Sequence, residues 1–130
     1  MKILLATLAL ATLANAGERF QAGLWELTSS GGSNAGTTRT CLSPVAVSPV
    51  NGNEATARAD AERTAAKYNM KIKIFSFKGN TVSMTMVSGT DVFVSVATYK
   101  GDTYDSKIIS KTSAGETTKI ITGKRLGACP

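Results

Sequence analysis

Short runs rich in Val, Ile, Thr, Phe and Tyr alternate with glycine-bearing turns along the second half of the chain. Such runs favour β-strands, and glycine supplies the positive φ that a tight hairpin turn requires. Strands joined by tight turns are antiparallel neighbours in a sheet. The pattern predicts a meander of five strands, at about residues 70–77, 81–88, 91–99, 103–112 and 116–124.

Upstream of this meander the sequence predicts a further hairpin. Residues 20–29 and 36–42 read as strands, the first apolar around Trp25 and the second rich in threonine, with a Ser/Gly/Asn turn between them. Trp25 sits in an apolar run, which favours an anchor of the core over a ligand platform. The hairpin brings the predicted sheet to about seven strands.

The segment between the hairpin and the meander is the one stretch without strand character. Pro44 and Pro49 predict a loop, and Asn51 with Glu54 three residues later resembles a capping box. A helix would then run to about Tyr68. The predicted fold class is mainly β: an antiparallel meander, in a curved sheet or a partly closed barrel, with one helix-containing connection at about 51–68.

Alternation of apolar and small polar residues predicts that the sheet has one buried face. The residues expected on that face are Val82, Met84 and Met86 from one strand and Val92, Val94 and Val96 from the next.

The strand at 70–77 does not follow this alternation. Ile72 and Ile74 have one parity, whereas Phe75 and Phe77 have the other. A β-bulge or a strong local twist accounts for such a switch and is expected here.

The first residues have the three parts of a secretory signal peptide: Lys2, an apolar run to Leu13 and a small-residue site ending at Ala16. Cleavage after Ala16 is predicted, which leaves residues 17–130 as one β-rich domain. The apolar run is shorter than the roughly 20 residues that a membrane-spanning helix needs, so no membrane span is expected in the mature chain. The predicted destination is the periplasm or the cell exterior.

The chain has two cysteines, Cys41 and Cys129. Disulfides persist in exported proteins, and two cysteines allow one pairing. Neither cysteine belongs to a Cys-x-x-Cys pair, and the chain has no histidine that would activate a thiol. A structural Cys41–Cys129 bridge is therefore predicted rather than a pair of reactive thiols.

The usual sequence signatures of catalysis and cofactor binding are missing. The chain has no histidine and no glycine-flanked serine motif, and its cysteines are assigned to each other. Asp102 and Asp105 fall in or beside predicted turns, where local hydrogen bonding explains carboxylates. The sequence predicts a non-catalytic protein with no cofactor and no metal; convergence of Asp102 with Asp105 in a pocket is the one enzyme-like alternative.

Lys71 and Lys73 share a predicted strand with Phe75 and Phe77, a mixture that can neutralise and stack on single-stranded nucleic acid. Lysines also protect edge strands from pairing with other sheets, and export removes most nucleic acid from reach. The net charge of +6 is scattered along the chain rather than blocked. Nucleic-acid binding is not expected.

A family resemblance rests on three segments: an opening strand at Gly23–Glu26, a cysteine motif at Thr38–Pro44 and a closing cysteine motif at Gly123–Cys129. In this order they resemble the domain of unknown function 3617 family of small exported bacterial proteins. The resemblance covers nearly all of residues 17–130. It implies export, a β architecture and the Cys41–Cys129 bridge, and it implies no activity, ligand or site.

Many members of that family carry a second cysteine pair, which this chain lacks. Met70 and Met86 fall near the corresponding positions. The resemblance therefore implies that these two side chains lie close together and replace a bridge by apolar packing.

The function favoured by these observations is binding of a small apolar ligand or a partner protein in the cell envelope. The curved face of the sheet, or the space beneath the connection at 43–68, is the expected place. The alternative is a structural or self-assembling subunit of an envelope or extracellular assembly, because the two edge strands of a meander can pair between copies. The sequence singles out no binding residue.

Overall fold

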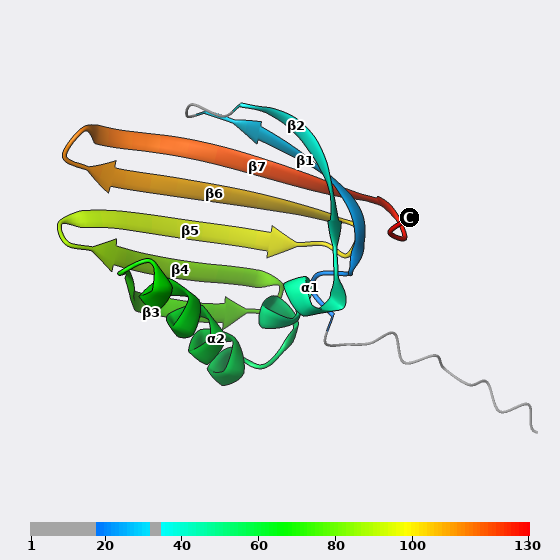
Figure 1. Ribbon diagram of the computed structural model, residues 1–130, viewed down its shortest axis with the longest axis horizontal. Helices are drawn as coiled ribbons and strands as arrows, with labels where there is room; N and C mark the ends of the chain where they lie inside the picture. Colours follow the sequence, from blue (N-terminus) through cyan, green and yellow to red (C-terminus); the bar gives the residue numbers. More distant parts are fainter. Residues whose placement is uncertain (1–17, 32–34) are drawn as a thin grey trace, which may run out of the picture.

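A computed structural model describes residues 18–31 and 35–130 of the chain (Figure 1). The signal peptide predicted at 1–16 lies outside the described residues. The strands are β1 (Gly23–Ser30), β2 (Gly36–Leu42), β3 (Lys71–Lys78), β4 (Thr81–Ser88), β5 (Asp91–Tyr99), β6 (Thr103–Thr112) and β7 (Gly115–Gly127). The helices are α1 (Pro44–Asn51) and α2 (Glu54–Lys67).

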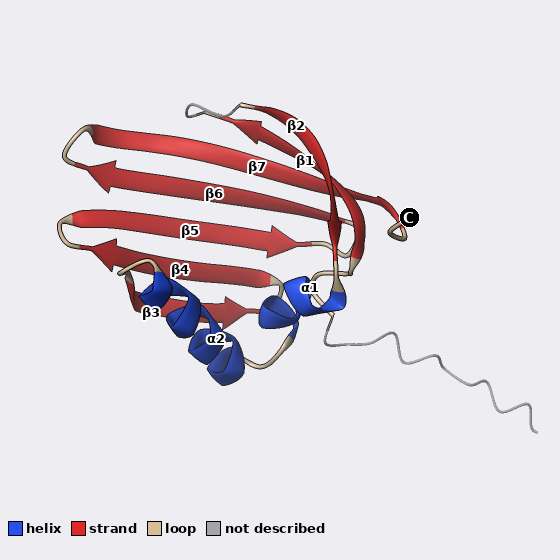
Figure 2. Cartoon of the chain, in the orientation of Figure 1, coloured by secondary structure: helices blue, strands red, loops and turns tan. Residues whose placement is uncertain are grey.

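The described strands form one antiparallel sheet in the order β2-β1-β7-β6-β5-β4-β3. The predicted meander is confirmed, and the β1–β2 hairpin joins it because β1 pairs with β7. β2 and β3 are the two edges, so the sheet is curved and open rather than closed into a barrel (Figure 2). The helical connection leads from one edge to the other across one face, which we call the concave face (Figure 1).

Turn length decides which side chains share the concave face. The turn at Gly89 pairs Ser88 with Asp91, so Met86 lies opposite Phe93 rather than opposite a valine. Opposed residues of an antiparallel pair point to the same side of the sheet. The valines at 92, 94 and 96 therefore lie on the convex face, where Val96 is 40% exposed, and their predicted place in the core is wrong.

The bulge expected in β3 is confirmed. Its pairing with β4 shifts between Ile72 and Ile74, leaving one extra residue on β3. The extra residue turns Ile74 to the convex face, where it is 57% exposed, and Phe75 and Phe77 to the concave face. The mixed parity of this strand in the sequence is thus the mark of the bulge.

The stretch from Pro44 to Pro49, predicted as a loop, is helical. Ser43 caps α1 by accepting a backbone hydrogen bond at 3.2 Å, and Pro44 occupies the first turn, where its missing N–H is not needed. Pro49 lies inside the helix and cannot donate to the Val45 carbonyl. The Ser48 hydroxyl donates to that carbonyl instead, at 3.0 Å, which explains how the helix tolerates Pro49.

α2 starts later than the sequence predicted, at Glu54, because its N-cap is Asn53 and not Asn51. The Asn53 side chain accepts a hydrogen bond from the Thr56 N–H at 2.8 Å. Glu54 closes no capping box; its carboxylate accepts the Phe77 N–H of β3 at 3.0 Å. The glutamate thereby satisfies a backbone donor on the sheet edge.

Alanines on one side of α2 allow the helix to lie close to the sheet. Ala57 and Ala65 are buried, whereas Tyr68, at the C-terminal end of the helix, is 71% exposed. The main contacts of α2 are with β3 and α1. The helix therefore covers the β3 side of the concave face and leaves the middle of the sheet without a second layer.

Cys41 and Cys129 form the predicted disulfide, with their Cα atoms 5.5 Å apart. The two residues are separated by 88 positions in the sequence, so the bridge closes most of the described chain into one loop. It ties edge strand β2 to the segment that follows β7.

Candidate functional site

One end of the concave face is closed by an aromatic cluster, which we define as Phe20, Trp25, Tyr99 and Tyr104. The Phe20 ring, from the segment before β1, lies 4.7 Å from Trp25, 5.1 Å from Tyr99 and 5.2 Å from Tyr104 between ring centroids. Trp25 is fully buried, and its indole N–H donates to the Gln21 carbonyl at 2.9 Å. The segment before β1 thus covers this end of the sheet.

Burial in the cluster raises the pKa of Tyr99 to about 12, and the neighbouring Tyr104 adds to the effect. Burial also raises the pKa of Tyr104. Desolvation disfavours the phenolate form. Both rings are therefore uncharged at physiological pH and form an apolar wall.

Gly123 makes room for this wall. It lies opposite Tyr104 in the β6–β7 pairing, and a Cβ atom at this position would overlap the Tyr104 ring. A side chain on β7 at this point would displace the tyrosine from the cluster.

Polar contacts hold the segment before β1 in place. Asn51, at the end of α1, accepts the Phe20 N–H at 2.9 Å and donates to the Phe20 carbonyl at 2.7 Å. Arg19 donates to the Gly79 carbonyl at 2.8 Å, and its guanidinium carbon lies 4.5 Å from the centroid of the Phe77 ring. Asn51 is therefore an anchor for the covering segment rather than a helix cap.

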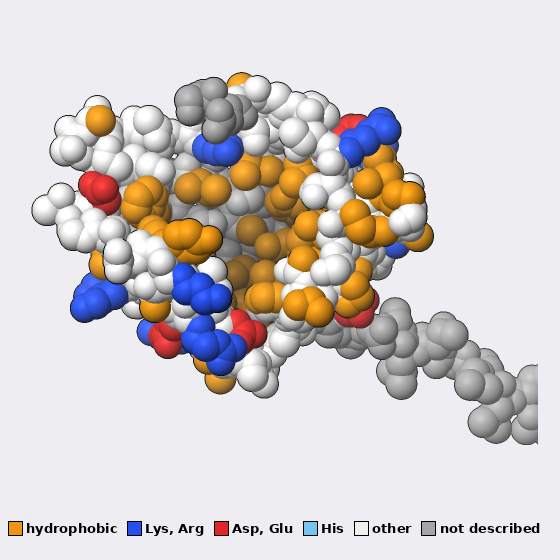
Figure 3. All heavy atoms as spheres, in the orientation of Figure 1, with side chains coloured by type: hydrophobic (Ala, Val, Ile, Leu, Met, Phe, Trp, Pro, Cys, Tyr) orange, Lys and Arg blue, Asp and Glu red, His pale blue; other side chains and the backbone are white. Residues whose placement is uncertain are grey.

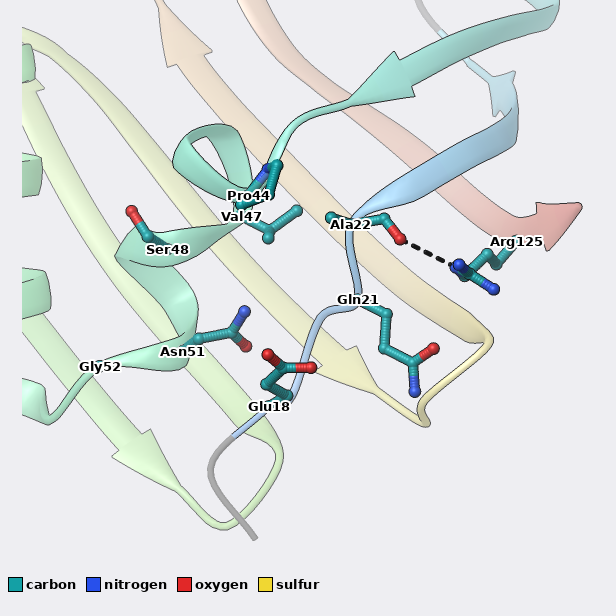
Figure 4. A pocket seen from close by; sticks show the side chains of 9 residues that line it. All are labelled: Glu18, Gln21, Ala22, Pro44, Val47, Ser48, Asn51, Gly52 and Arg125. Carbon is teal, nitrogen blue, oxygen red and sulfur yellow. Dashed lines mark hydrogen bonds between the residues drawn. The ribbon is translucent and has the colours of Figure 1, made fainter. Parts of the chain in front are cut away.

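A cavity of about 560 Å³ lies between this segment, α1 and β7 (Figure 4). Its lining is mixed in polarity, and Figure 4 shows the side chains of Glu18 and Asn51 turned toward one another. Arg125 on the far side donates to the Ala22 carbonyl at 3.0 Å. Asn51 and Arg125 both hold the segment before β1 in place, so their polar groups are already engaged. This cavity is therefore a weaker candidate for a ligand site than the open middle of the concave face.

The middle of the concave face is open. The strand register places two residues from each of β4, β5, β6 and β7 here, and we call them the trough: Met84, Met86, Phe93, Ser95, Ser106, Ile108, Lys119 and Ile121. All are only partly buried. Figure 3 shows that this side of the molecule is hollowed and that hydrophobic side chains gather in the hollow.

Small side chains in the two central strands deepen the trough. Ser95 lies opposite Met84, and Ser106 lies opposite Ile121, so larger residues rise on either side of a low centre. The fully or nearly fully buried hydrophobic residues among those described are Trp25, Val47, Ala57, Ala65, Val82 and Ala97. Val82 and Ala97 belong to the concave face, in the row that continues to Ser106 and Ile121, so the trough lies directly beside buried residues. Most trough residues are apolar and yet only partly buried.

An apolar pocket of about 380 Å³ lies between α2 and the β4 side of the trough. Its lining residues are Pro49, Asp60, Ala61, Thr64, Ala65, Tyr68, Met70, Met84 and Met86. Met70 and Met86 both line this pocket, although the residue directly opposite Met86 on β3 is Ile72. Methionine adapts to irregular ligand shapes, and the volume falls within the range of small-molecule sites. The trough with this pocket is the candidate site.

Lys71, Lys73, Phe75 and Phe77, which the sequence associates, are not brought together on one surface. Phe75 and Phe77 lie on the concave face with their ring centroids 5.3 Å apart. Lys71 lies opposite Val87, on the convex side of edge strand β3. Lys71 therefore faces away from the two rings, and Lys73 is the extra residue of the bulge, with no partner on β4.

Asp102 and Asp105 have separate local roles. The Asp105 carboxylate lies 3.5 Å from Lys100 Nζ at the surface, and the Asp102 carbonyl accepts the Arg125 N–H at 2.8 Å. Within residues 18–31 and 35–130, no three His, Cys, Asp or Glu side chains come together as a metal site would require.

Sequence reasoning named the curved face of the sheet as the expected binding place but not the residues of the trough, because these depend on the register between strands. In the apolar–polar alternation of their strands, Ser95 and Ser106 look like residues that face solvent. The signal that would have found them is the two-residue turn at Gly89, which fixes Ser95 opposite Met84 and not opposite Thr85.

No helix in the described part of the chain is long and apolar enough to cross a membrane. Comparisons with protein-family models, with curated proteins and with solved structures find no match to this chain.

Proposed function

We propose that this chain is an exported, non-catalytic protein that binds a small apolar molecule in the trough and the adjoining pocket. One observation carries the proposal: Met84, Phe93 and Ile108 stay partly exposed in a hollow, while neither helix lies over the central strands. Leaving apolar surface in water costs about 25 cal/mol per Å². A ligand that fills the trough would remove this cost, as the second layer of a sheet normally does.

Export is supported by three observations. The Cys41–Cys129 disulfide suits an oxidising compartment. The first residues have the composition of a signal peptide, and three segments resemble a family of exported bacterial proteins. We propose the periplasm or the cell exterior as the place of action.

Native mass spectrometry tests the proposal on protein purified from the envelope or secreted fraction of its host. The expected result is a mass above that of the oxidised chain, lost after extraction with organic solvent. A protein that carries no extractable molecule and takes up none from a lipid extract of the same host would refute the proposal.

Two leucine substitutions provide a matched comparison. Ser95→Leu fills the centre of the trough, whereas Ser83→Leu adds the same bulk on the convex face, where Ser83 lies opposite Val96. We expect Ser95→Leu to abolish the extractable mass and Ser83→Leu to retain it. Equal loss in both variants would place the ligand elsewhere.

Self-assembly is a second candidate function, favoured by edge strand β2. Among the described strands it pairs only with β1, and most of its residues are exposed. Unpaired strand edges can add a strand from a second copy. Bare masses at integer multiples of the chain, in the same experiment, would favour this function over ligand binding.

A further inference from the structure

We infer that the molecule held in the trough is a single-chain amphiphile with an anionic head, its head at Lys119 and its chain running toward Met84 and the pocket under α2. The inference rests on the proposed function and adds the chemical class and orientation of the ligand. Its basis is Lys119, the one lysine of β6 and β7 that lies on the concave face.

Lys119 differs from the other lysines of β6 and β7. It lies opposite Ile108, in the alternation of β7 that also carries Ile121 on the concave face. Lys119 is partly buried, whereas its neighbour Ile120 on the convex face is 45% exposed. The lysines at 107, 111 and 124 lie on the convex face and are exposed. A lysine is thus held in the hollow while an isoleucine beside it faces solvent.

No carboxylate within residues 18–31 and 35–130 forms an ion pair with Lys119. The described pairs are Arg39–Glu26, Arg58–Glu62, Arg63–Asp60, Lys100–Asp105 and Lys111–Glu116. An ammonium group beside apolar side chains attracts an anion more strongly than a fully solvated ammonium group does, because water screens its charge less. The head of an anionic ligand meets this requirement.

The pocket at the opposite end of the site has no lysine or arginine among the described residues that line it. Asp60 lines the pocket under α2, where its carboxylate pairs with Arg63. Arg125, at the aromatic end of the concave face, is engaged by the Ala22 carbonyl. An anionic head is therefore favoured at the β7 side, and the apolar chain is favoured on the methionines.

The distance between the two ends fits an extended acyl chain. Lys119, Ile108, Ser95 and Met84 lie opposite one another in a single row across β7, β6, β5 and β4. Neighbouring strands are about 4.8 Å apart, so the row spans roughly 14 Å. An extended dodecanoate chain has about this length, and the small side chain of Ser95 leaves space for it in the middle of the row.

Calorimetric titration of the delipidated protein with three probes of equal chain length tests the inference: dodecanoate, dodecanol and dodecyltrimethylammonium, each below its aggregation concentration. We expect dodecanoate to bind most tightly and the cation most weakly. Lys119→Gln should weaken dodecanoate binding roughly fivefold, the size expected of one partly solvated ion pair, and leave dodecanol binding unchanged.

Lys107→Gln is the matched control, since Lys107 lies on β6 and faces the convex side opposite Ile120. We expect no change in binding of either probe. Unfolding of both variants at the wild-type temperature would show that the fold is retained.

The outcomes separate this inference from the proposed function. Equal binding of all three probes, with no effect of Lys119→Gln, would overturn the anionic-head inference and leave an apolar site standing. Loss of dodecanoate binding in Lys107→Gln rather than in Lys119→Gln would overturn the placement of the head. Failure of every probe to bind would overturn the inference together with the proposed function.

Discussion

The aromatic cluster and the trough occupy the same face of the same sheet, yet one is packed and the other is open. At the cluster, Phe20 closes over Trp25, which has no exposed surface. In the trough, which shares β5 and β6 with the cluster, Met84 and Phe93 remain partly exposed.

The difference lies in what covers each region. Residues before β1 lie over the cluster, held there by Asn51 and Arg19. No segment of the described chain has a comparable role over the central strands, and Ser95 and Ser106 keep the side chains there short. Tight packing at the aromatic cluster can thus stabilise the sheet, while the trough keeps an accessible apolar surface.

Replacement of Trp25 should have the largest effect on stability. We expect Trp25→Ala to lower the free energy of unfolding by about 4 kcal/mol, because it removes the centre of the cluster and leaves a cavity. Urea denaturation measures the change, and Trp25→Phe should recover part of the loss. If Trp25→Ala cost no more than a substitution in the trough, the division into a packed and an open region would be wrong.

Removal of the disulfide should have the next largest effect. The double variant Cys41→Ser, Cys129→Ser should lose roughly 3 kcal/mol, since the 88-residue separation constrains the unfolded chain strongly. The bridge joins β2 to the segment after β7 and lines a hollow with Ala22, near the covered end of the sheet. Ligand binding in the trough should therefore survive in this variant; its loss would show that the two ends are coupled.

The disulfide and the meander could be predicted because each depends on residues that are local or few. Two cysteines allow one bridge, and glycine-bearing turns mark the ends of neighbouring strands. The bulge in β3 was also visible, because Ile74 and Phe75 change parity within one strand. Features that depend on the residues of one strand or one turn can thus be predicted from the sequence.

Most residues of the open face could not be assigned from the sequence, because the assignment depends on the register between strands. Alternation alone predicted the valines of β5 in the core. The register instead places Phe93, Ser95 and Ala97 on the concave face. The helix containing Pro49 was missed for a related reason: the Ser48 hydroxyl compensates for the missing donor, which no propensity describes. In both cases a short-range rule was overridden by a specific contact.

Alkaline pH should weaken the packed region before the open one. Burial raises the pKa of Tyr99 to about 12 in the folded protein, above the ordinary value of 10.0. The folded state therefore holds this proton more tightly than the unfolded state does. The stabilisation is fully present below about pH 10 and is lost as pH rises toward about 12, by roughly 2–3 kcal/mol.

Denaturation at a series of alkaline pH values, with phenolate absorbance followed in parallel, measures this loss. Tyr99→Phe should reduce the slope of stability against pH, because the variant has no proton to lose at this position. A slope equal to that of the wild type would show that other groups cause the alkaline destabilisation.

The smallest effect is expected in the trough, and a pair of substitutions on β4 isolates it. Val82 and Met84 lie two residues apart on the same strand and the same face, but Val82 is buried with 9% exposure and Met84 is partly exposed. Val82→Ala should cost about 2 kcal/mol, since a cavity forms in packed surroundings. Met84→Ala should cost less than about 1 kcal/mol in the ligand-free protein, although it removes the larger side chain, because water already reaches that site.

Addition of dodecanoate should then reverse the order of the two variants in binding. Met84→Ala removes apolar surface that the chain of the ligand would contact, so it should weaken binding, whereas Val82→Ala should leave binding nearly unchanged. Stability and binding would thus depend on different residues of one strand face. If Met84→Ala proved as costly as Val82→Ala without ligand, the trough would be part of the packed core, and the case for a binding surface would fail with it.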